Sequence, residues 1–345
     1  MSVPPRTPEP NFDHLIAMTD ERGTFEHALF SEPRPEHGYC TDDMARVLVV
    51  AARERGRSPK TRTLAMLSLR FMQDALDSQG RCRNRMDRTG RWEDSPTLDD
   101  CWGRTIWGLG TAASRSHDPL IRHFATRTLE RAMTRRSPWP RSMAFAAIGA
   151  SEVLSVHPDN ATAHRLLSDA ADALSGLSGL SGRAAWPWPE ERLHYANATL
   201  PEAMIAAGST LGRPLLMRRG LDLLGWLLDR ETRDGHLSVT PVGGSGPGDR
   251  GPGFDQQPIE VGALADACAR ALSVDGDRRW MDGISAAADW FLGDNDLGVP
   301  MWDPGTGGAF DGLQQAGANL NQGTESTLAF ISTLQHARSY VSVLP

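Results

Sequence analysis

Residues 137–154 read SPWPRSMAFAAIGASEVL, a turn-forming start that leads into an alanine-rich stretch with almost no polar side. A helix that is apolar on every side is surrounded by protein. Small Ala and Gly residues let such helices approach one another closely. A polar, turn-rich segment followed by a helical stretch of this kind recurs six times, beginning at about residues 41, 97, 137, 199, 257 and 321.

More amphipathic helices are expected between these buried ones. Their expected positions are residues 59–76, 119–135, 160–174, 214–229 and 278–292, with residues 11–18 as the source of a sixth. Inner and outer helices that alternate six times predict an all-α (α/α)6 toroid. We expect a single domain over residues 1–345, with residues 1–24 as a partly irregular N-terminal segment. An open superhelix of helical repeats is the structural alternative, but its loops are usually short and its period fixed.

The loops expected here are long and unequal. The longest are residues 78–96, 179–198, 231–256 and 293–320, and each precedes an inner helix. In a toroid these loops gather at one end, beside the N-termini of the inner helices. Long loops on a rigid scaffold usually carry function, so the functional site is expected at that end.

The composition argues against several classes of protein. A formal net charge of -7 and a pI near 5.8 do not suit a nucleic-acid binder, which needs a concentrated basic face. No apolar stretch reaches the roughly 18 residues of a membrane span, and the start MSVPPRTPEPNFDH has no apolar signal region. A cytoplasmic protein that binds neither nucleic acid nor membrane is expected.

Neither a disulfide framework nor a metal site is expected. The four cysteines, Cys40, Cys82, Cys101 and Cys268, are far apart and form no CxxC pair, so we interpret them as buried thiols. The ten histidines show no HExxH or paired spacing, so we expect no metal and no cofactor.

Carboxylates, amides and aromatic side chains recur at the expected inner-helix starts. A pyranose ring stacks on an aromatic face and hydrogen-bonds its hydroxyls to such polar groups, and two carboxylates suffice for glycoside hydrolysis. The predicted catalytic residues are Asp43, Asp100 and Glu260. The predicted sugar-contacting residues are His37, Tyr39, Asp42, Trp92, Asp99, Trp102, Trp188, Glu190, His194, Tyr195, Asn197, Glu202, Asp255, Gln256, Gln257, Asn321 and Glu325.

Acids in a first helical turn also have a structural explanation, because capping and the helix dipole favour them. Residues 199–202 (TLPE) match a capping box, which gives Glu202 a structural alternative. Asp43 and Asp100 are each the second acid of a pair, in HGYCTDD and SPTLDDCWGR, and one cap needs only one acid. Glu260 lies three residues after Gln257 and could close a cap, but it follows the unusually polar GFDQQP.

Four segments carry a resemblance to a known family. They are HGYCTDDMAR (37–46), WPWPEERLHYANATLPEA (186–203), GFDQQPIEVGA (253–263) and NQGTEST (321–327). They resemble uncharacterised six-hairpin, (α/α)6 glycosidase-like proteins that occur beside or fused to glycosyltransferases. The resemblance spans about residues 25–335 and implies the toroid, a carbohydrate context and a glycosyltransferase as a potential partner. It supplies no agreed catalytic pair.

The leading hypothesis is a glycoside hydrolase that acts on an intracellular oligosaccharide by carboxylate acid/base catalysis. The resemblance to the six-hairpin superfamily favours inversion. An inverting glycoside phosphorylase is one alternative, with the flexible residues 241–253 and Arg250 as a weak anion-binding hint. A sugar epimerase is another, although histidines are scarce at the inner-helix starts. A non-catalytic glycan-binding partner of a glycosyltransferase would keep the aromatic and amide groups without a proton-transfer pair.

Overall fold

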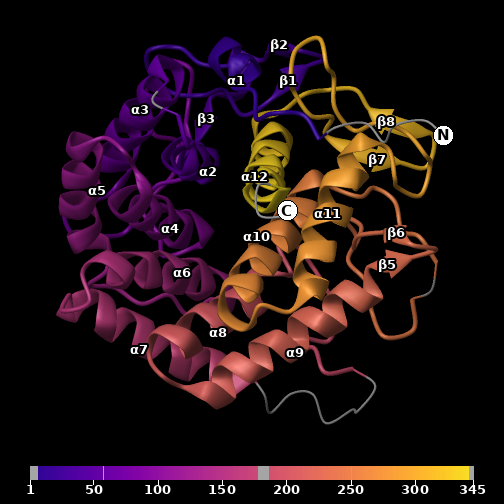
Figure 1. Cartoon of the computed structure of the whole chain (residues 1–345). Coiled ribbons are helices and arrows are strands. Elements are labelled where there is room, and N and C mark those ends of the chain that lie inside the picture. Colours follow the sequence, from indigo (N-terminus) through magenta and orange to yellow (C-terminus); the bar gives the residue numbers. More distant parts are fainter. Residues whose placement is uncertain (1–6, 57, 178–185, 250, 342–345) are drawn as a thin grey trace.

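The computed structural model describes residues 7–56, 58–177, 186–249 and 251–341, which form two concentric rings of helices (Figure 1). The inner ring is α2 (Thr41–Arg53), α4 (Asp100–Arg115), α6 (Pro140–Val156), α8 (Thr199–Thr210), α10 (Pro258–Asp275) and α12 (Thr324–Val341). The outer ring is α3 (Pro59–Ala75), α5 (Pro119–Ala132), α7 (Ala161–Gly176), α9 (Pro214–Arg230), α11 (Arg278–Leu292) and the short α1 (Asp13–Ala17).

The inner ring is closed. Each inner helix contacts the next, and α12 returns to contact α2. Each of α3, α5, α7, α9 and α11 packs on the inner helix before it, while α1 packs on α12 and takes the sixth outer position. The expectation of an all-α (α/α)6 toroid is therefore confirmed.

The inner helices are buried on all sides, as their sequences predict. In α6 every residue from Arg141 to Leu154 is buried. The contact between α4 and α6 is so close that glycine is required: a Cβ on Gly110 would collide with the carbonyl oxygen of Gly149, and one on Gly149 with that of Ile106. Small residues thus set how tightly the ring closes.

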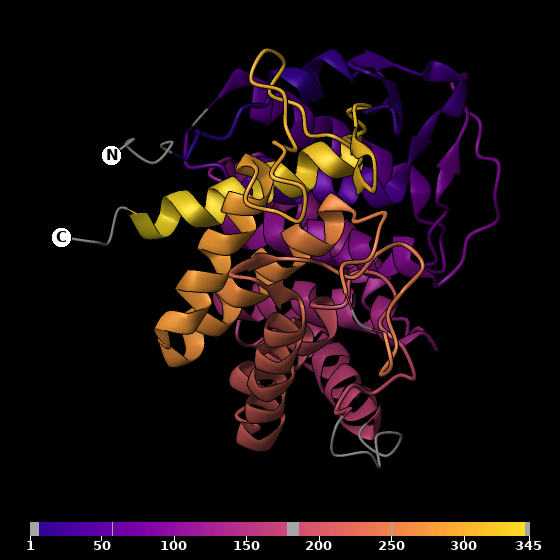
Figure 2. The ribbon, with the colours of Figure 1, turned by 90° about the vertical axis from the view of Figure 1, so that its right-hand side faces the viewer.

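Short antiparallel ribbons decorate the loops. They pair β1 (Ala28–Leu29) with β2 (Glu32–Pro33), β3 (Tyr39–Cys40) with β4 (Arg85–Met86), β5 (Thr232–Arg233) with β6 (His236–Leu237), and β7 (Gly312–Gln314) with β8 (Gly317–Asn319). A 3-10 turn, η1 (Pro35–His37), lies between β2 and β3. Seen from the side, the loops of residues 77–99 and 231–257 lie together on the right, away from the C-terminal end of α12 (Figure 2).

Among the helices that the structure describes, none combines the length and apolar character needed to cross a membrane.

The close contact between α4 and α6 gives a first prediction. Gly110→Ala should lower the free energy of unfolding by about 1–3 kcal/mol, because the added methyl group forces two packed backbones apart. Gly176→Ala is the matched control, since no atom lies near a Cβ at that end of α7. Denaturant unfolding measures both variants. A Gly110→Ala protein as stable as the wild type would show that the ring is not limited by this contact.

Candidate functional site

A single arginine joins two carboxylates at the end of the toroid where the long loops gather. Arg104 Nη1 lies 3.0 Å from Asp42 Oδ1, and its Nη2 lies 3.4 Å from Asp100 Oδ2. Tyr195, from the loop before α8, donates its hydroxyl to Asp100 Oδ2 at 2.9 Å. We call this region, formed by Asp42, Asp100, Glu190, Tyr195 and Glu325, the mouth of the toroid. The side chains of Asp42 and Asp100 are 17% and 18% exposed, so small molecules in solvent can reach them.

Arg104 sets the charge state of Asp42. Burial alone would raise the pKa of the Asp42 carboxyl, but Arg104 and Arg46 outweigh it and hold that pKa below its usual range. Arg104 is itself buried against the ring of Phe145, 4.7 Å from its centroid, and the neighbouring carboxylates keep its pKa high. Asp42 is therefore an ionised carboxylate, the form that a general base requires.

A second arginine fixes Tyr195. Arg141, in the first turn of α6, binds both carboxylate oxygens of Glu190 at 2.6 and 2.8 Å. Its Nε donates to the carbonyl of Tyr195 at 2.7 Å, and its guanidinium lies 4.9 Å from the centroid of the tyrosine ring. A two-pronged arginine–carboxylate pair has a defined geometry. The phenol is therefore held facing Asp100.

Glu260 holds the backbone next to Tyr195. Its carboxylate accepts hydrogen bonds from the main-chain N–H groups of Ala196 and Asn197 and from the Asn197 side chain. Ala196 has a positive φ of 45°, which is costly for a residue other than glycine, and these bonds stabilise it. Glu260 is buried, and burial raises its pKa to about 7. These bonds favour a role for Glu260 in positioning Tyr195, although Glu260 also lines a pocket beside Tyr195.

Asp43 is also enclosed. Its side chain is 2% exposed, accepts from the Cys40 thiol at 3.1 Å, and pairs with Arg46 at 2.7 Å. The other terminal nitrogen of Arg46 lies 2.7 Å from Glu325, whose side chain is 42% exposed. Burial raises the pKa of Asp43. Its enclosure argues against the predicted direct proton transfer to a ligand and favours a role in positioning Arg46.

Several predicted sugar contacts belong to the protein core instead. Trp102 is fully buried and donates to the carbonyl of Ala132 on the outer ring. Trp188 packs against Trp226 and donates to Glu190. Both rings are buried, which argues against the predicted sugar contacts and favours a role in the core.

Tyr39 and Trp92 face the outer ring as well. Tyr39 is buried between Phe25 and Phe71, and its hydroxyl donates to Asp20. Trp92 is half-buried and donates to Asp74 of α3. These contacts favour a packing role over the predicted contact with sugar, because the polar atom of each ring donates to an acid outside the mouth.

The polar segment before α10 contains both structural residues and a residue that lines a pocket. Gln256 is buried and donates to Asp296 and to the carbonyl of Gly253, so it is structural. Asp255 accepts from Gln314. Gln257 instead lines a pocket of 160 Å³ beside Tyr195, together with His194.

The remaining predicted residues lie in different places. Asp99 is exposed before α4 and makes no capping bond with its side chain. His37 is exposed, with the ring of His27 edge-on at 4.9 Å. Asn321 accepts from the backbone N–H of Phe30 at 2.9 Å.

The capping box expected at residues 199–202 is not formed. The residue before α8, Ala198, already has helical dihedral angles and offers no side-chain cap. Thr199 is thus the first residue of the helix and cannot serve as its N-cap. Glu202 lies deeper inside the toroid, near Arg270 of α10, and not in the mouth.

The arginines of the site were missing from the predicted set. Arg46, Arg104 and Arg141 lie in the first two turns of inner helices and are buried. Arg46 and Arg104 each follow an acid by four residues, the spacing that places both on one helical face. That spacing, in Asp42 to Arg46 and Asp100 to Arg104, was a signal that could have identified them.

One cluster in the described residues has atoms spaced as in a metal site. Ligand-type atoms of Glu26, Cys40 and Asp43 lie within 4.8 Å of one another. Protein cations already compensate this cluster, because Arg46 pairs with Asp43 and Arg85 with Glu26. Burial raises the pKa of the Cys40 thiol, which keeps its proton and donates it to Asp43. The donor set therefore fits a divalent ion poorly.

Glu231, next to the mouth, gives a prediction of pH dependence. It is buried at the end of α9, accepts from Thr240, and burial raises its pKa from 4.5 to about 8. Between these values the folded protein keeps a proton that the unfolded chain releases, so stability falls as pH rises. Glu231→Gln should remove this part of the decline and be more stable than the wild type by roughly 2–4 kcal/mol at about pH 8, but not at about pH 4.5.

Urea titrations at several pH values measure that difference. Glu191→Gln, an exposed neighbour of the mouth, is the control and should follow the wild-type curve. A wild type and Glu231→Gln variant with parallel pH profiles would contradict the assignment.

The comparisons with known proteins agree with the fold. No protein-family model matches the chain, and no curated protein sequence matches it. The solved structures with this fold include a sugar epimerase from a ruminal bacterium, 12% identical, with a TM-score of 0.70 over 95% of each chain. They also include the cellobiose 2-epimerase of Spirochaeta thermophila, 14% identical, with a TM-score of 0.62 over 97% of this chain and 95% of the other. The GH76 α-mannanase of Bacteroides thetaiotaomicron is 10% identical, with a TM-score of 0.61 over 88% and 87%. The chain therefore has the (α/α)6 toroid fold found in sugar epimerases and glycosidases.

Proposed function

We propose that the chain is a carbohydrate-active enzyme, and specifically a glycoside hydrolase that acts on an oligosaccharide in the mouth of the toroid. The observation that carries this proposal is the pair of accessible carboxylates, Asp42 and Asp100, held on one guanidinium by Arg104. Hydrolysis of a glycosidic bond needs two carboxyl groups beside the same sugar. The fold neighbours named as a mannanase and as epimerases support the carbohydrate context.

Each group then has a definite task. One carboxyl group protonates the oxygen of the leaving sugar while the other removes a proton from water, and the water oxygen attacks the anomeric carbon. Asp42 suits the base, because Arg104 and Arg46 keep it ionised. Asp100 is our candidate for the acid, with exposed Glu325 as the alternative. The exposed ring of Tyr195 provides a face on which a sugar can stack.

A sugar epimerase is the second candidate, and one observation favours it. His27 and His37, both exposed, lie edge to face at 4.9 Å on the loops that precede α2. An imidazole is the type of base that can remove a proton from the carbon beside a carbonyl and return a proton to it. Arg250, the anion-binding hint for a phosphorylase, lies outside the described residues. A glycosyltransferase partner and a cytoplasmic location stay proposals that rest on the sequence alone.

Proton NMR of a panel of gluco- and manno-oligosaccharides in D2O separates these activities. Hydrolysis creates new reducing ends and shortens the chain. Epimerisation keeps the chain length and introduces deuterium at the carbon that is inverted. Phosphorolysis proceeds only when phosphate is added. Deuterium incorporation without chain shortening would overturn the hydrolase proposal in favour of the epimerase.

On the substrate so identified, Asp100→Asn should reduce turnover by about 100-fold or more, because the amide cannot transfer the proton. Tyr195→Phe should cost about tenfold, since Asp100 loses one hydrogen bond. Asp169→Asn, on the outer helix α7, removes an acid that among the described residues pairs with Arg136, and it should leave turnover unchanged. Steady-state kinetics and thermal midpoints are measured together. Near-normal turnover in Asp100→Asn would exclude this residue from the proton transfer.

A further inference from the structure

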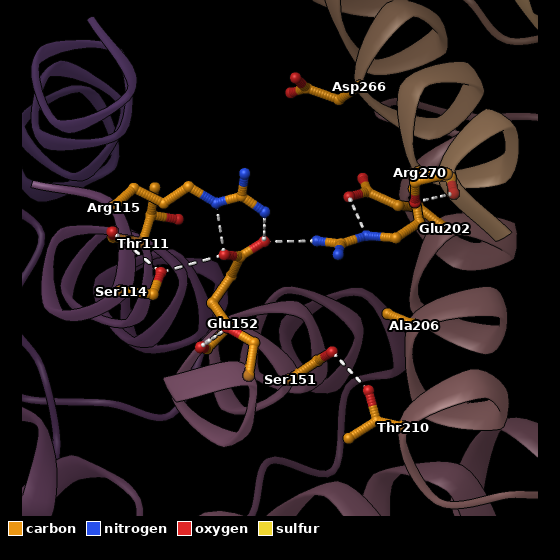
Figure 3. A network of polar contacts seen from close by, with 12 residues as sticks. Thr111, Ser114, Arg115, Ser151, Glu152, Glu202, Ala206, Thr210, Asp266 and Arg270 are labelled. Atoms are coloured by element: carbon orange, nitrogen blue, oxygen red, sulfur yellow. Dashed lines mark hydrogen bonds and ion pairs between the residues drawn. The ribbon is translucent and has the colours of Figure 1, made fainter. Parts of the chain in front are cut away.

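A second polar chamber lies at the opposite end of the toroid, where the inner helices end. It has a volume of 420 Å³. We call it the C-terminal chamber, and its principal charged lining residues are Arg53, Arg115, Glu152, Glu202, Asp266 and Arg270. Figure 3 shows most of these side chains converging from α4, α6, α8 and α10. Pockets of about 300–1,000 Å³ hold small organic ligands, whereas one water fills about 30 Å³.

Two of the chamber's carboxylates have sufficient partners within the protein. Glu152 accepts from Arg115 at 2.8 and 3.2 Å and from Arg270 at 2.7 Å. Burial opposes its ionisation, but these two arginines hold the pKa of Glu152 down to about 2. Asp266 is bound by Arg53 and His336, each at 2.6 Å. These contacts tie the ends of the inner helices together, and a structural role explains them.

Glu202 is different. Its side chain is 6% exposed and makes no hydrogen bond with any described residue. Its nearest cationic atom, Arg270 Nε, is 3.8 Å away and is a buried donor that itself lacks a hydrogen-bond partner. Burial and the nearby Asp266 raise the pKa of Glu202. Glu202 and Arg270 thus form a loose ion pair without a hydrogen bond, and the Glu202 carboxylate lines the chamber as an acceptor with bonds still to be made.

Arg55 supplies a charge that the protein does not neutralise. It lies beyond the end of α2, is exposed, and makes no ion pair or hydrogen bond among the described residues. The chamber is lined by five arginines and three carboxylates, and one of these arginines, Arg338, pairs with two acids outside it, Glu9 and Glu54. Arginines at helix C-termini also offset the helix dipole. That role explains Arg53 and Arg115, which are the last residues of α2 and α4. It does not explain Arg55, which lies beyond the end of α2.

We propose that the C-terminal chamber binds a small hydroxylated anion, such as a sugar phosphate. A ligand hydroxyl donates to Glu202, while the anionic group lies against Arg55. A bare inorganic ion satisfies only the second contact, and a neutral sugar only the first. The inference is independent of the hydrolase proposal, because none of the residues that define the mouth lines the chamber.

Isothermal titration of the full chain with glucose 6-phosphate tests the proposal, with glucose and inorganic phosphate as comparators. Glucose 6-phosphate should bind at one site, at least about tenfold more tightly than either comparator. Arg55→Ala and Glu202→Gln should each weaken that binding by about tenfold or more. Arg213→Ala, whose partner Asp172 is on the outer ring, and Glu191→Gln are the matched controls and should bind as the wild type does.

Three results would overturn the proposal. One is the absence of glucose 6-phosphate binding to the wild type at up to about 10 mM, where even weak sites are occupied. The second is binding that neither variant affects, which puts the ligand elsewhere, for instance in the mouth. The third is inorganic phosphate binding as tightly as glucose 6-phosphate, with Glu202→Gln unchanged. Thermal midpoints check folding, and Arg55→Ala, at an exposed position, carries the test if Glu202→Gln fails to fold.

Discussion

The parallel packing of six inner helices is the constraint on which the rest of this structure depends. Each helix has a partial positive charge at its N-terminus and a partial negative charge at its C-terminus. Because the helices run in one direction, these charges add up at the two ends of the ring. Acids such as Asp42 and Asp100 stand at the positive end, and Arg53 and Arg115 at the negative end. The common direction of the inner helices thus favours acidic residues at one end of the ring and basic residues at the other, whatever reaction the protein catalyses.

Between the two polar ends lies an apolar layer. Val49, Trp107, Phe145, Ile148 and Leu328 contribute to it, and only 40 Å³ of free volume is left among the side chains there. Residues from both ends line this layer as well: Arg46 and Ala196 lie on the side of the mouth, and Glu202 and Asp266 also line the C-terminal chamber.

The fold could be predicted from the sequence because the same helical pattern occurs six times. Six buried stretches alternate with amphipathic ones, and the helices begin within a few residues of the expected positions, as at Thr41, Thr199 and Arg278. The site was harder to predict. Consecutive residues of a helix point in directions about 100° apart. This difference decides that Asp42 faces the mouth while its neighbour Asp43 faces the ring interior. Trp102 and Tyr195 are both aromatic residues near the start of an inner helix. Contacts with residues distant in the sequence decide that Trp102 is buried and Tyr195 is exposed.

The closure of the ring imposes an order of events during synthesis. The last inner helix, α12, begins at Thr324 and contacts both α2, which begins at Thr41, and the N-terminal α1, which begins at Asp13. Until α12 emerges, the side of α2 that it covers, including Val47 and Val50, is without its partner Leu328. Domains that pair distant segments fold slowly and expose apolar surface while they wait. The nascent chain therefore exposes this apolar side of α2 through most of its translation. A chaperone would cover the exposed surface, and rapid translation would shorten the time for which it is exposed.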